Sequence, residues 1–290
     1  MAGCVMVGIT LGALVLMSFR LTNTSINTVD EAEIMLGLSV LTAVPQMPGV
    51  KRAGDALVVM ADPNSAGAEA FRTLRASMAI SGNSEDRRVF LFTSALPEEG
   101  KTFCSTNYAA SLSQLGIKTL IIDADLRKPA VELRLMGEQS HSPGLADYQM
   151  GQKKLEEVVR PTKFPNLYLI SSGSIDSNPA ELLAKDGMEG LIKEALQHYD
   201  RIIVDSAPMS VVGDTLLLLK SVQTVCLVVR AASTSSRYVL RCVQVLQGAM
   251  APLEGVILNG MPRHRALTYG AYYDYHYHGK YGKEGVYAAR

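Results

Sequence analysis

The feature that most constrains the fold of this chain is a series of short apolar runs separated by helical stretches. Short, unbroken apolar runs between helices are typical of a parallel sheet covered on both faces. Right-handed crossovers would then place the carboxyl ends of the strands along one edge, where ligands bind. The predicted strands are 89–92, 119–122, 167–170, 202–204, 225–229 and 255–258, and helices are expected over 66–80 and near 102–115, 180–198, 211–220 and 235–249.

A candidate phosphate-binding loop follows the first predicted strand and precedes a predicted helix. It reads SALPEEGKTF from Ser94 to Phe103, and strand, loop and helix in this order are the context in which Gly-Lys-Thr binds phosphate. Backbone N–H groups and the start of the helix attract anions, Lys101 would reach the terminal phosphates, and the Thr102 hydroxyl would bind Mg²⁺. The predicted nucleotide-binding residues are Pro97, Glu98, Glu99, Gly100, Lys101, Thr102 and Phe103.

Two consecutive carboxylates make this loop unusual. Glu98 stands where related loops often have glycine, and a positive φ there would cost a glutamate about 1–2 kcal/mol. Glu98 and Glu99 would also repel a nucleotide unless their side chains turn outward to water. The loop alone therefore gives only a moderate prediction of a nucleotide site.

Three aspartates at strand ends strengthen that prediction. The run TLIIDADLR delivers Asp123 and Asp125 to the ligand edge, and RIIVDSAP delivers Asp205 to the same edge. Carboxylates on adjacent strand ends can hold hydrated Mg²⁺ and accept a proton from an attacking hydroxyl. Together with the loop, they predict an α/β P-loop NTPase with a nucleotide site.

The N-terminal segment carries no charge over 18 positions, from Ala2 to Phe19. That length is near the lower limit for a membrane-spanning helix, so one transmembrane helix is predicted before the α/β domain. Arg20, Lys51 and Arg52 follow it, and this positive charge places the remainder in the cytosol. A signal peptide and a buried helix of a soluble domain are the alternatives.

The C-terminal segment is rich in tyrosine and poor in aliphatic residues. Such a composition has little with which to pack a core, so a flexible tail is expected, although an aromatic edge segment is the alternative. Seven of the twelve tyrosines lie in the last 22 residues: Tyr269, Tyr272, Tyr273, Tyr275, Tyr277, Tyr281 and Tyr287. The predicted division is a transmembrane helix (1–20), a juxtamembrane segment and linker (21–65), a P-loop domain (66–265) and this tail (266–290).

Composition excludes some classes of protein. The formal net charge is zero, so no overall field would attract nucleic acid, and no nucleic-acid partner is expected. The four cysteines lie far apart without a C-x-x-C pair, which argues against a zinc site or a disulfide framework and suits a reducing cytosol.

The ordered motifs resemble those of the bacterial tyrosine kinase family, whose members accompany capsule and exopolysaccharide export. The family's second Walker motif is similar to Leu120–Arg127, and its Walker B motif is similar to Ile202–Pro208, with Ala207 in place of a proline. The stretch Leu36–Pro45 is similar to the segment that follows the family's second membrane helix. The family's helical Glu-x-x-Arg-x-x-Arg motif corresponds to Glu69, Arg72 and Arg75.

This resemblance implies ATP-dependent, Mg²⁺-dependent autophosphorylation on the tail tyrosines. It implies that Thr102 and Asp205 support the metal, that Asp123 accepts the tyrosine proton, and that Lys101, Asp125 and Arg127 complete the phosphate environment. Glu69, Arg72 and Arg75 would join subunits into a homo-oligomeric ring, although exposed salt-bridge decoration would explain them equally simply. Further implied partners are polysaccharide-export membrane proteins and a cognate tyrosine phosphatase, at the bacterial inner membrane with the kinase domain in the cytosol.

Two other functions fit the same residues. Partition or division-site ATPases share the P-loop architecture, but they carry a lysine five residues before the phosphate lysine, where this chain has Leu96. A catalytically weak ATP-binding scaffold is suggested by Glu98, Glu99 and Ala207. The family usually has another membrane helix and a periplasmic domain before the segment that begins this chain, so the chain resembles a fragment or half of a split system.

Overall fold

The computed structural model describes residues 25–47, 57–80, 87–140, 142–174, 178–184, 187–210, 213–262 and 265–266. The expected transmembrane helix at 1–20 and the seven tail tyrosines lie outside these residues and stay predictions. Within the described ranges, no helix combines the length and the apolar character needed to cross a bilayer.

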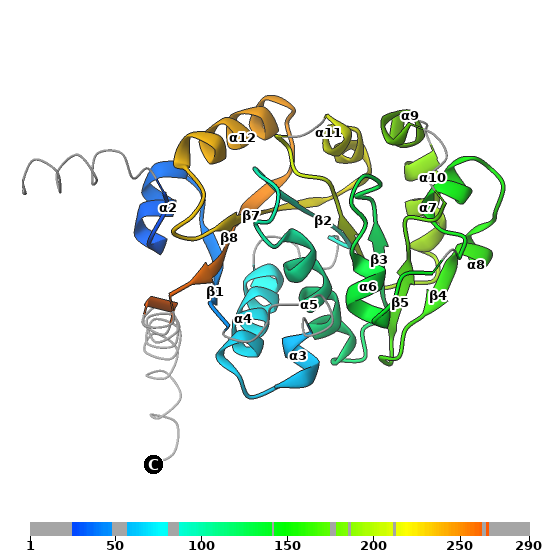
Figure 1. The fold of residues 1–290 in the computed structure, drawn as a ribbon, viewed down its shortest axis with the longest axis horizontal. Coiled ribbons are helices and arrows are strands. Elements are labelled where there is room, and N and C mark those ends of the chain that lie inside the picture. Colours follow the sequence, from blue (N-terminus) through cyan, green and yellow to red (C-terminus); the bar gives the residue numbers. More distant parts are fainter. Residues whose placement is uncertain are drawn as a thin grey trace, which may run out of the picture.

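An eight-stranded sheet forms the centre of the molecule (Figure 1). Its order is β1-β8-β7-β2-β6-β3-β5-β4, and every pairing is parallel except that of β4 with β5. The mostly parallel sheet predicted from the sequence is confirmed. The strands are β1 (Val40–Pro45), β2 (Val89–Ser94), β3 (Thr119–Asp123), β4 (Val159–Pro161), β5 (Leu167–Ile170), β6 (Arg201–Asp205), β7 (Thr224–Arg230) and β8 (Leu253–Met261).

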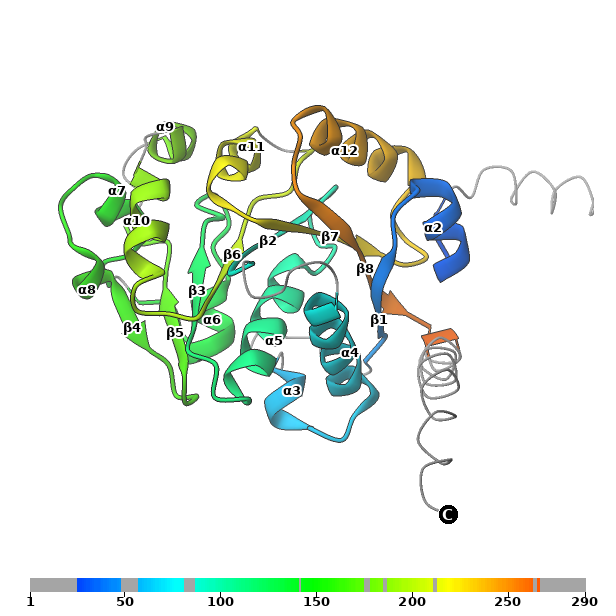
Figure 2. The same ribbon diagram turned by 180° about the vertical axis from the view of Figure 1, so that it is seen from behind.

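Helices cover both faces of this sheet, as Figures 1 and 2 show from opposite sides. One face carries α3 (Val58–Ala61), α4 (Ala66–Ile80), α5 (Lys101–Ser113) and α6 (Val131–Met136). The other face carries α2 (Val29–Leu36), α7 (Leu145–Gln149), α8 (Leu155–Val158), α9 (Pro179–Ala184), α10 (Gly187–Ala195), α11 (Asp214–Leu218) with a short 3₁₀ turn (Leu219–Ser221), and α12 (Ser236–Gly248).

Side chains of each strand alternate between two hydrophobic cores, one on each face. In β2, Phe90 and Phe92 pack beneath α4 and α5, whereas Leu91 packs in the opposite core. Successive residues of a strand point to opposite faces, so an unbroken apolar run supplies both cores at once. This alternation explains why the runs seen in the sequence are almost entirely apolar.

Helix α2 is capped at both ends, because the Thr28 hydroxyl accepts a hydrogen bond from the Glu31 amide at 3.2 Å and Gly37 closes the helix with a positive φ. The single helix expected over 180–198 is instead two helices, α9 and α10. The Asp186-Gly187 dipeptide is a turn signal that this prediction overlooked.

Strand β1 was not predicted, since its residues were assigned to a juxtamembrane segment. It pairs in parallel with β8, with Thr42 opposite Ile257, and all six of its residues are buried. The sheet therefore extends N-terminal to residue 66, where the P-loop domain was expected to begin. This edge strand pairs with β8, which lies more than 200 positions away in the sequence. Local sequence patterns do not show such a pairing.

Candidate active site

Three neighbouring strands bring the phosphate loop and the aspartates together. Strand β6 lies between β2 and β3, with Asp205 opposite Phe92 on one side and opposite Asp123 on the other. The loop after β2 leads into α5, whose first residues are Lys101 and Thr102. Because these strands are parallel, their carboxyl ends meet at one edge of the sheet, as the sequence predicted.

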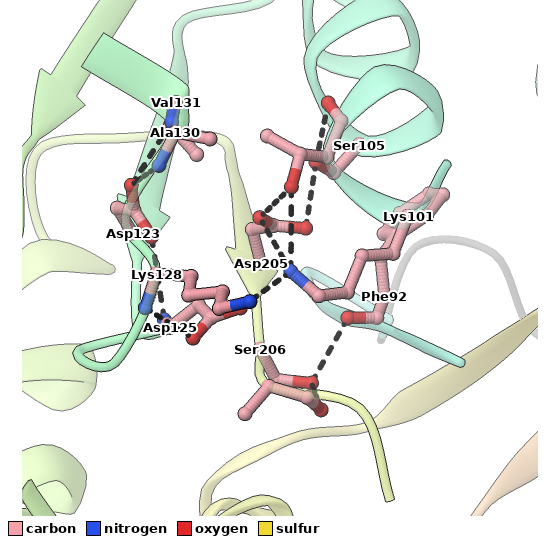
Figure 3. Close-up of polar contacts among 12 residues, drawn as sticks. Phe92, Lys101, Ser105, Asp123, Asp125, Lys128, Ala130, Val131, Asp205 and Ser206 are labelled. Carbon is pink, nitrogen blue, oxygen red and sulfur yellow. Dashed lines mark hydrogen bonds and ion pairs between the residues drawn. The ribbon is translucent and has the colours of Figure 1, made fainter. Parts of the chain in front are cut away.

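Asp205 lies at the centre of this site and is fully buried (Figure 3). Its Oδ2 accepts a hydrogen bond from Thr102 Oγ1 at 2.7 Å, and its Oδ1 accepts one from Ser105 Oγ at 3.1 Å. Burial raises the pKa of Asp205, while Lys101 and Thr102 oppose that rise because they favour the ionised carboxylate. The two predicted metal ligands, Thr102 and Asp205, are therefore in direct contact.

Lys101 connects two of the three aspartates. Its Nζ lies 2.7 Å from Asp125 Oδ2 and 3.6 Å from Asp205 Oδ2. Burial alone lowers the pKa of Lys101, but the negative charges of Asp205 and Asp125 outweigh burial, so the net shift is upward. The lysine is therefore held as a cation in the site, the form that binds phosphate.

Asp123 has a different environment from its neighbours. Its Oδ2 accepts hydrogen bonds from the amides of Ala130 and Val131, each at 2.9 Å, whereas Oδ1 accepts only a longer one of 3.3 Å from the Asp125 amide. Burial and then the negative charge of Asp205 raise the pKa of Asp123 to about 7. A carboxylate with this pKa is a stronger base than an ordinary aspartate.

The phosphate loop has a strained backbone at Glu98, the position where related loops often have glycine. Glu98 has φ of 65° and an exposed side chain, so its carboxylate does turn to water. Gly100 has φ of 91°, and a Cβ there would lie 2.0 Å from Asn259 Nδ2. Glycine is therefore required at position 100, and glutamate is tolerated at position 98 at a conformational cost.

Glu99 differs from expectation because its side chain turns inward rather than to water. It is 2% exposed, and its carboxylate accepts hydrogen bonds from the Leu96 amide at 2.7 Å, the Arg230 amide at 3.4 Å and the Thr234 hydroxyl. Burial raises the pKa of Glu99, and these hydrogen bonds offset only part of that rise. The Glu99 side chain therefore holds the loop in shape and does not contact the phosphate side.

Two other predicted residues make side-chain contacts that the sequence did not indicate. Arg127 Nε donates to Asp214 Oδ2 at 2.8 Å, at the start of α11, so this guanidinium is paired away from Asp123 and Asp205. The side chain of Phe103 is buried and packs edge-on against Phe71, with ring centroids 5.6 Å apart. Phe103 can thus serve a nucleotide only through its backbone.

The residues of the Glu-x-x-Arg-x-x-Arg motif lie on α4. Glu69 and Arg72 form an exposed ion pair, and Arg72 also donates to the Pro63 carbonyl. Arg75 Nη1 donates to the Ser111 carbonyl of α5 at 2.6 Å. Part of the motif therefore ties two helices of the same chain together.

The site can accept Mg²⁺ together with a nucleotide. Thr102, Asp125 and Asp205 are oxygen donors, which Mg²⁺ prefers, and Mg²⁺ is usually held by one or two carboxylates plus substrate phosphates. Among the described residues, no group of three or more His, Cys, Asp or Glu side chains is arranged to hold a metal alone. The donor set thus fits a metal that arrives with phosphate.

Some residues of the site were missed at the level of sequence. Ser105 follows Thr102 by three positions and so shares its helix face, a signal that could have identified it. Thr234 follows β7 and Asn259 lies near the end of β8, and nothing local connects them with the phosphate loop.

Comparisons with known proteins agree with this geometry. Residues 99–248 match the model of a family described as AAA domain. The Bacillus subtilis (strain 168) tyrosine-protein kinase YwqD is 32% identical over 216 residues, which cover 74% of this chain and 90% of YwqD. The Escherichia coli (strain K12) tyrosine-protein kinase etk is 34% identical over 208 residues, which cover 72% of this chain but only 28% of the relative's length.

Solved structures give the same result. The kinase domain of the Escherichia coli tyrosine kinase ETK superposes with a TM-score of 0.72 and 32% identity, covering 79% of this chain and 93% of that domain. The septum site-determining protein MinD of Pyrococcus horikoshii OT3 has a TM-score of 0.52 and 24% identity, covering 62% of this chain and 75% of MinD, which shows the P-loop NTPase fold alone. The chain therefore belongs to the family of bacterial tyrosine-protein kinases.

Proposed function

We propose that this chain is an ATP-dependent protein-tyrosine kinase that phosphorylates C-terminal tyrosines of its own or a neighbouring subunit. The observation that carries the proposal is the position of Lys101, which lies between Asp125 and Asp205 at the start of the helix after the phosphate loop. A cation and buried carboxylates at a helix N-terminus suit phosphoryl transfer, which needs mainly alignment and charge neutralisation.

Lys101, Thr102 and Asp205 would position the nucleotide. The Lys101 ammonium would exchange its 2.7 Å contact with Asp125 for the terminal phosphates, while the Thr102 hydroxyl and the Asp205 carboxylate would hold the metal. Bound Mg²⁺ would supply charge neutralisation at the phosphate oxygens. Backbone N–H groups of residues 97–103 would contact the phosphates.

Asp123 is the proposed proton acceptor. In the transfer step, a tyrosine oxygen forms a bond to the γ-phosphorus, the bond from that phosphorus to the leaving ADP oxygen breaks, and the tyrosine proton passes to Asp123. The less occupied Oδ1 is the oxygen that would receive it, because Oδ2 already accepts two amide hydrogen bonds. A pKa near neutral supports this role.

The topology of the sheet supports the C-terminal tyrosines as acceptors. Strand β8 is parallel to β7 and ends at Met261, so the chain leaves the sheet on the edge that carries the phosphate loop. If the last 24 residues behaved as the flexible chain that the sequence predicts, they would have a root-mean-square span of about 25–30 Å. The proposed acceptors are Tyr269, Tyr272, Tyr273, Tyr275, Tyr277, Tyr281 and Tyr287.

The assembly and location belong to the same proposal. Glu69, Arg72 and Arg75 on α4 would contact a neighbouring subunit of a ring, through the part of the motif that faces solvent. Residues 1–20 would anchor the chain in the bacterial inner membrane, and 266–290 would be the tail of a kinase domain that includes β1. Polysaccharide-export membrane proteins and a cognate phosphatase would be its partners, and phosphorylation would regulate polysaccharide synthesis and export.

Incubation of the full chain with Mg²⁺ and ATP tests the activity. Mass spectrometry should find phosphotyrosine within residues 269–287, and Lys101→Met should abolish it. Lys220→Met, which removes an exposed lysine far from the site, is the matched control and should retain it. ATP hydrolysis without phosphotyrosine would indicate a switch ATPase, and ATP binding without either reaction would indicate a scaffold.

A further inference from the structure

Buried side chains hold the phosphate loop on the side that faces away from the proposed nucleotide. The Glu99 carboxylate accepts hydrogen bonds from the Leu96 amide within the loop and from the Arg230 amide and the Thr234 hydroxyl outside it. Arg230 ends β7, and Thr234 belongs to the connection between β7 and α12, residues 231–235, which we call the β7–α12 loop. Glu99 thus joins two loops that are remote in sequence.

A second contact joins the phosphate loop to β8. Asn259 Nδ2 donates to the Glu99 carbonyl at 2.8 Å and lies against Gly100, where no side chain fits. Glu99, Thr234 and Asn259 are 2%, 4% and 4% exposed, so these hydrogen bonds are shielded from water. Charge-assisted hydrogen bonds in a buried site are stronger than exposed ones, and a buried carboxylate that loses a donor is left poorly compensated.

The β7–α12 loop is itself anchored to the N-terminal end of the described chain. The Ala232 amide donates to the Ile26 carbonyl at 2.8 Å, and Ser25 pairs with Ser235 in an isolated antiparallel bridge. Ala232 has a left-handed backbone with φ of 57°, which turns the loop between these contacts. The loop that holds Glu99 is therefore fixed on both of its sides.

We propose that Glu99 and Thr234 are positioning residues for ATP binding, which act by holding the phosphate loop in the shape that directs its backbone N–H groups at phosphate. The Leu96 amide donates to the Glu99 carboxylate and is therefore not directed at phosphate. The Thr234 hydroxyl in turn fixes the position of the Glu99 carboxylate. Neither side chain touches the nucleotide. This inference rests on the nucleotide proposed above, and it assigns the second acid of the loop a structural task instead of a phosphate contact.

The test compares three variants of the full chain in the same short loop. Thr234→Val keeps the side-chain shape but removes the hydroxyl, Thr234→Ser restores the hydroxyl, and Ser233→Ala removes an exposed hydroxyl one residue away. Calorimetry with Mg²⁺-ATP should show affinity about tenfold weaker for Thr234→Val, which corresponds to about 1.4 kcal/mol. Thr234→Ser and Ser233→Ala should stay within about twofold of the unchanged protein.

Hydrogen exchange without nucleotide tests the network independently of any activity. The Leu96 amide, which donates to Glu99, should exchange about tenfold faster in Thr234→Val, whereas amides of β3 should exchange at the unchanged rate. Faster exchange throughout β3 as well would show general destabilisation and would overturn the positioning role. Normal Leu96 exchange with normal ATP affinity would overturn it too.

A double-variant cycle tests whether Glu99 and Thr234 act through one shared hydrogen bond, which a misfolded single variant would not mimic. If Glu99→Gln and Thr234→Val break one shared hydrogen bond, the double variant should exchange at Leu96 no faster than the worse single variant. Additive effects would contradict the network. A chain that shows the exchange effects but makes no phosphotyrosine would refute the proposed kinase activity and leave the role of Glu99 and Thr234 intact.

Discussion

Lys101 Nζ lies closer to Asp125 Oδ2, at 2.7 Å, than to Asp205 Oδ2, at 3.6 Å. The second aspartate of the second Walker motif therefore holds the phosphate lysine more closely than the Walker B aspartate does. Because Asp125 also accepts the Lys128 amide, it fixes the loop after β3 at the same time. Any phosphate that recruits Lys101 has to compete with this pair.

Replacing Asp125 with asparagine should strengthen ATP binding measured in the absence of Mg²⁺. Loss of one buried negative charge removes both the competitor for Lys101 and part of the repulsion felt by phosphate, so we expect an affinity gain of several-fold in a nucleotide titration with chelator. Phosphotyrosine formation with Mg²⁺ should fall at least tenfold. Asp62→Asn, at an exposed position, is the control, and weaker binding in Asp125→Asn would contradict the competition.

Glycine at position 98 should stabilise the protein. A non-glycine residue with φ of 65° costs about 1–2 kcal/mol, and the entropy of glycine in the unfolded chain offsets about 0.5–1 kcal/mol of that. Urea unfolding should therefore show a gain of about 0.5–1 kcal/mol for Glu98→Gly. Glu98→Ala keeps the strained backbone, so an equal gain in that variant would show that the charge, and not φ, is responsible.

Stability should fall as pH rises, through the titration of Asp123. The ordinary pKa of aspartate is 3.8 and that of folded Asp123 is about 7, so the folded state holds a proton that the unfolded state releases. The stabilising contribution is complete below about pH 4 and is lost as pH rises through 7. Thermal unfolding from pH 5 to 8 should show a smaller slope in Asp123→Asn, while Glu189→Gln, on the exposed side of α10, should keep the slope of the unchanged protein.

The Arg127–Asp214 pair should act as one unit. Arg127→Gln and Asp214→Asn each remove the same 2.8 Å contact between the loop after β3 and α11. We expect the two single variants and the double variant to lose tyrosine phosphorylation to a similar extent, since one interaction is broken in all three. A much larger loss of tyrosine phosphorylation in Arg127→Gln than in Asp214→Asn would show that Arg127 also acts on phosphate directly. Because Arg127 is partly exposed, the stability change should stay at or below about 1 kcal/mol.

The site residues that follow directly from a strand pattern could be predicted from the sequence. Asp123, Asp125 and Asp205 end apolar strands, and parallel pairing alone brings such ends together, which is why their meeting with Lys101 and Thr102 followed from the pattern. The glycine that related loops often carry at position 98 indicated that a positive φ there would strain a glutamate. The crossover rule, which places the carboxyl ends of the strands along one edge, was enough for the prediction about the aspartates. The order of the strands in the sheet was not needed.

Long-range contacts were not predictable in the same way. The inward turn of Glu99 depends on Thr234, which lies 135 positions away, and the pairing of Arg127 depends on Asp214, 87 positions away. A charged residue in a loop is expected to face water unless a buried partner is known. Such partners are fixed by the tertiary fold, so the sequence could not supply them.

Strand β1 has a practical consequence for anyone preparing a shortened kinase domain. A fragment begun at residue 66, or at the start of the matched family model, would lack the strand that covers one side of β8. The bare hydrogen-bonding edge of β8 would then invite pairing between molecules and precipitation. Shortened versions should therefore begin no later than Ser25, so that the sheet keeps its own border strand and the Ser25–Ser235 bridge.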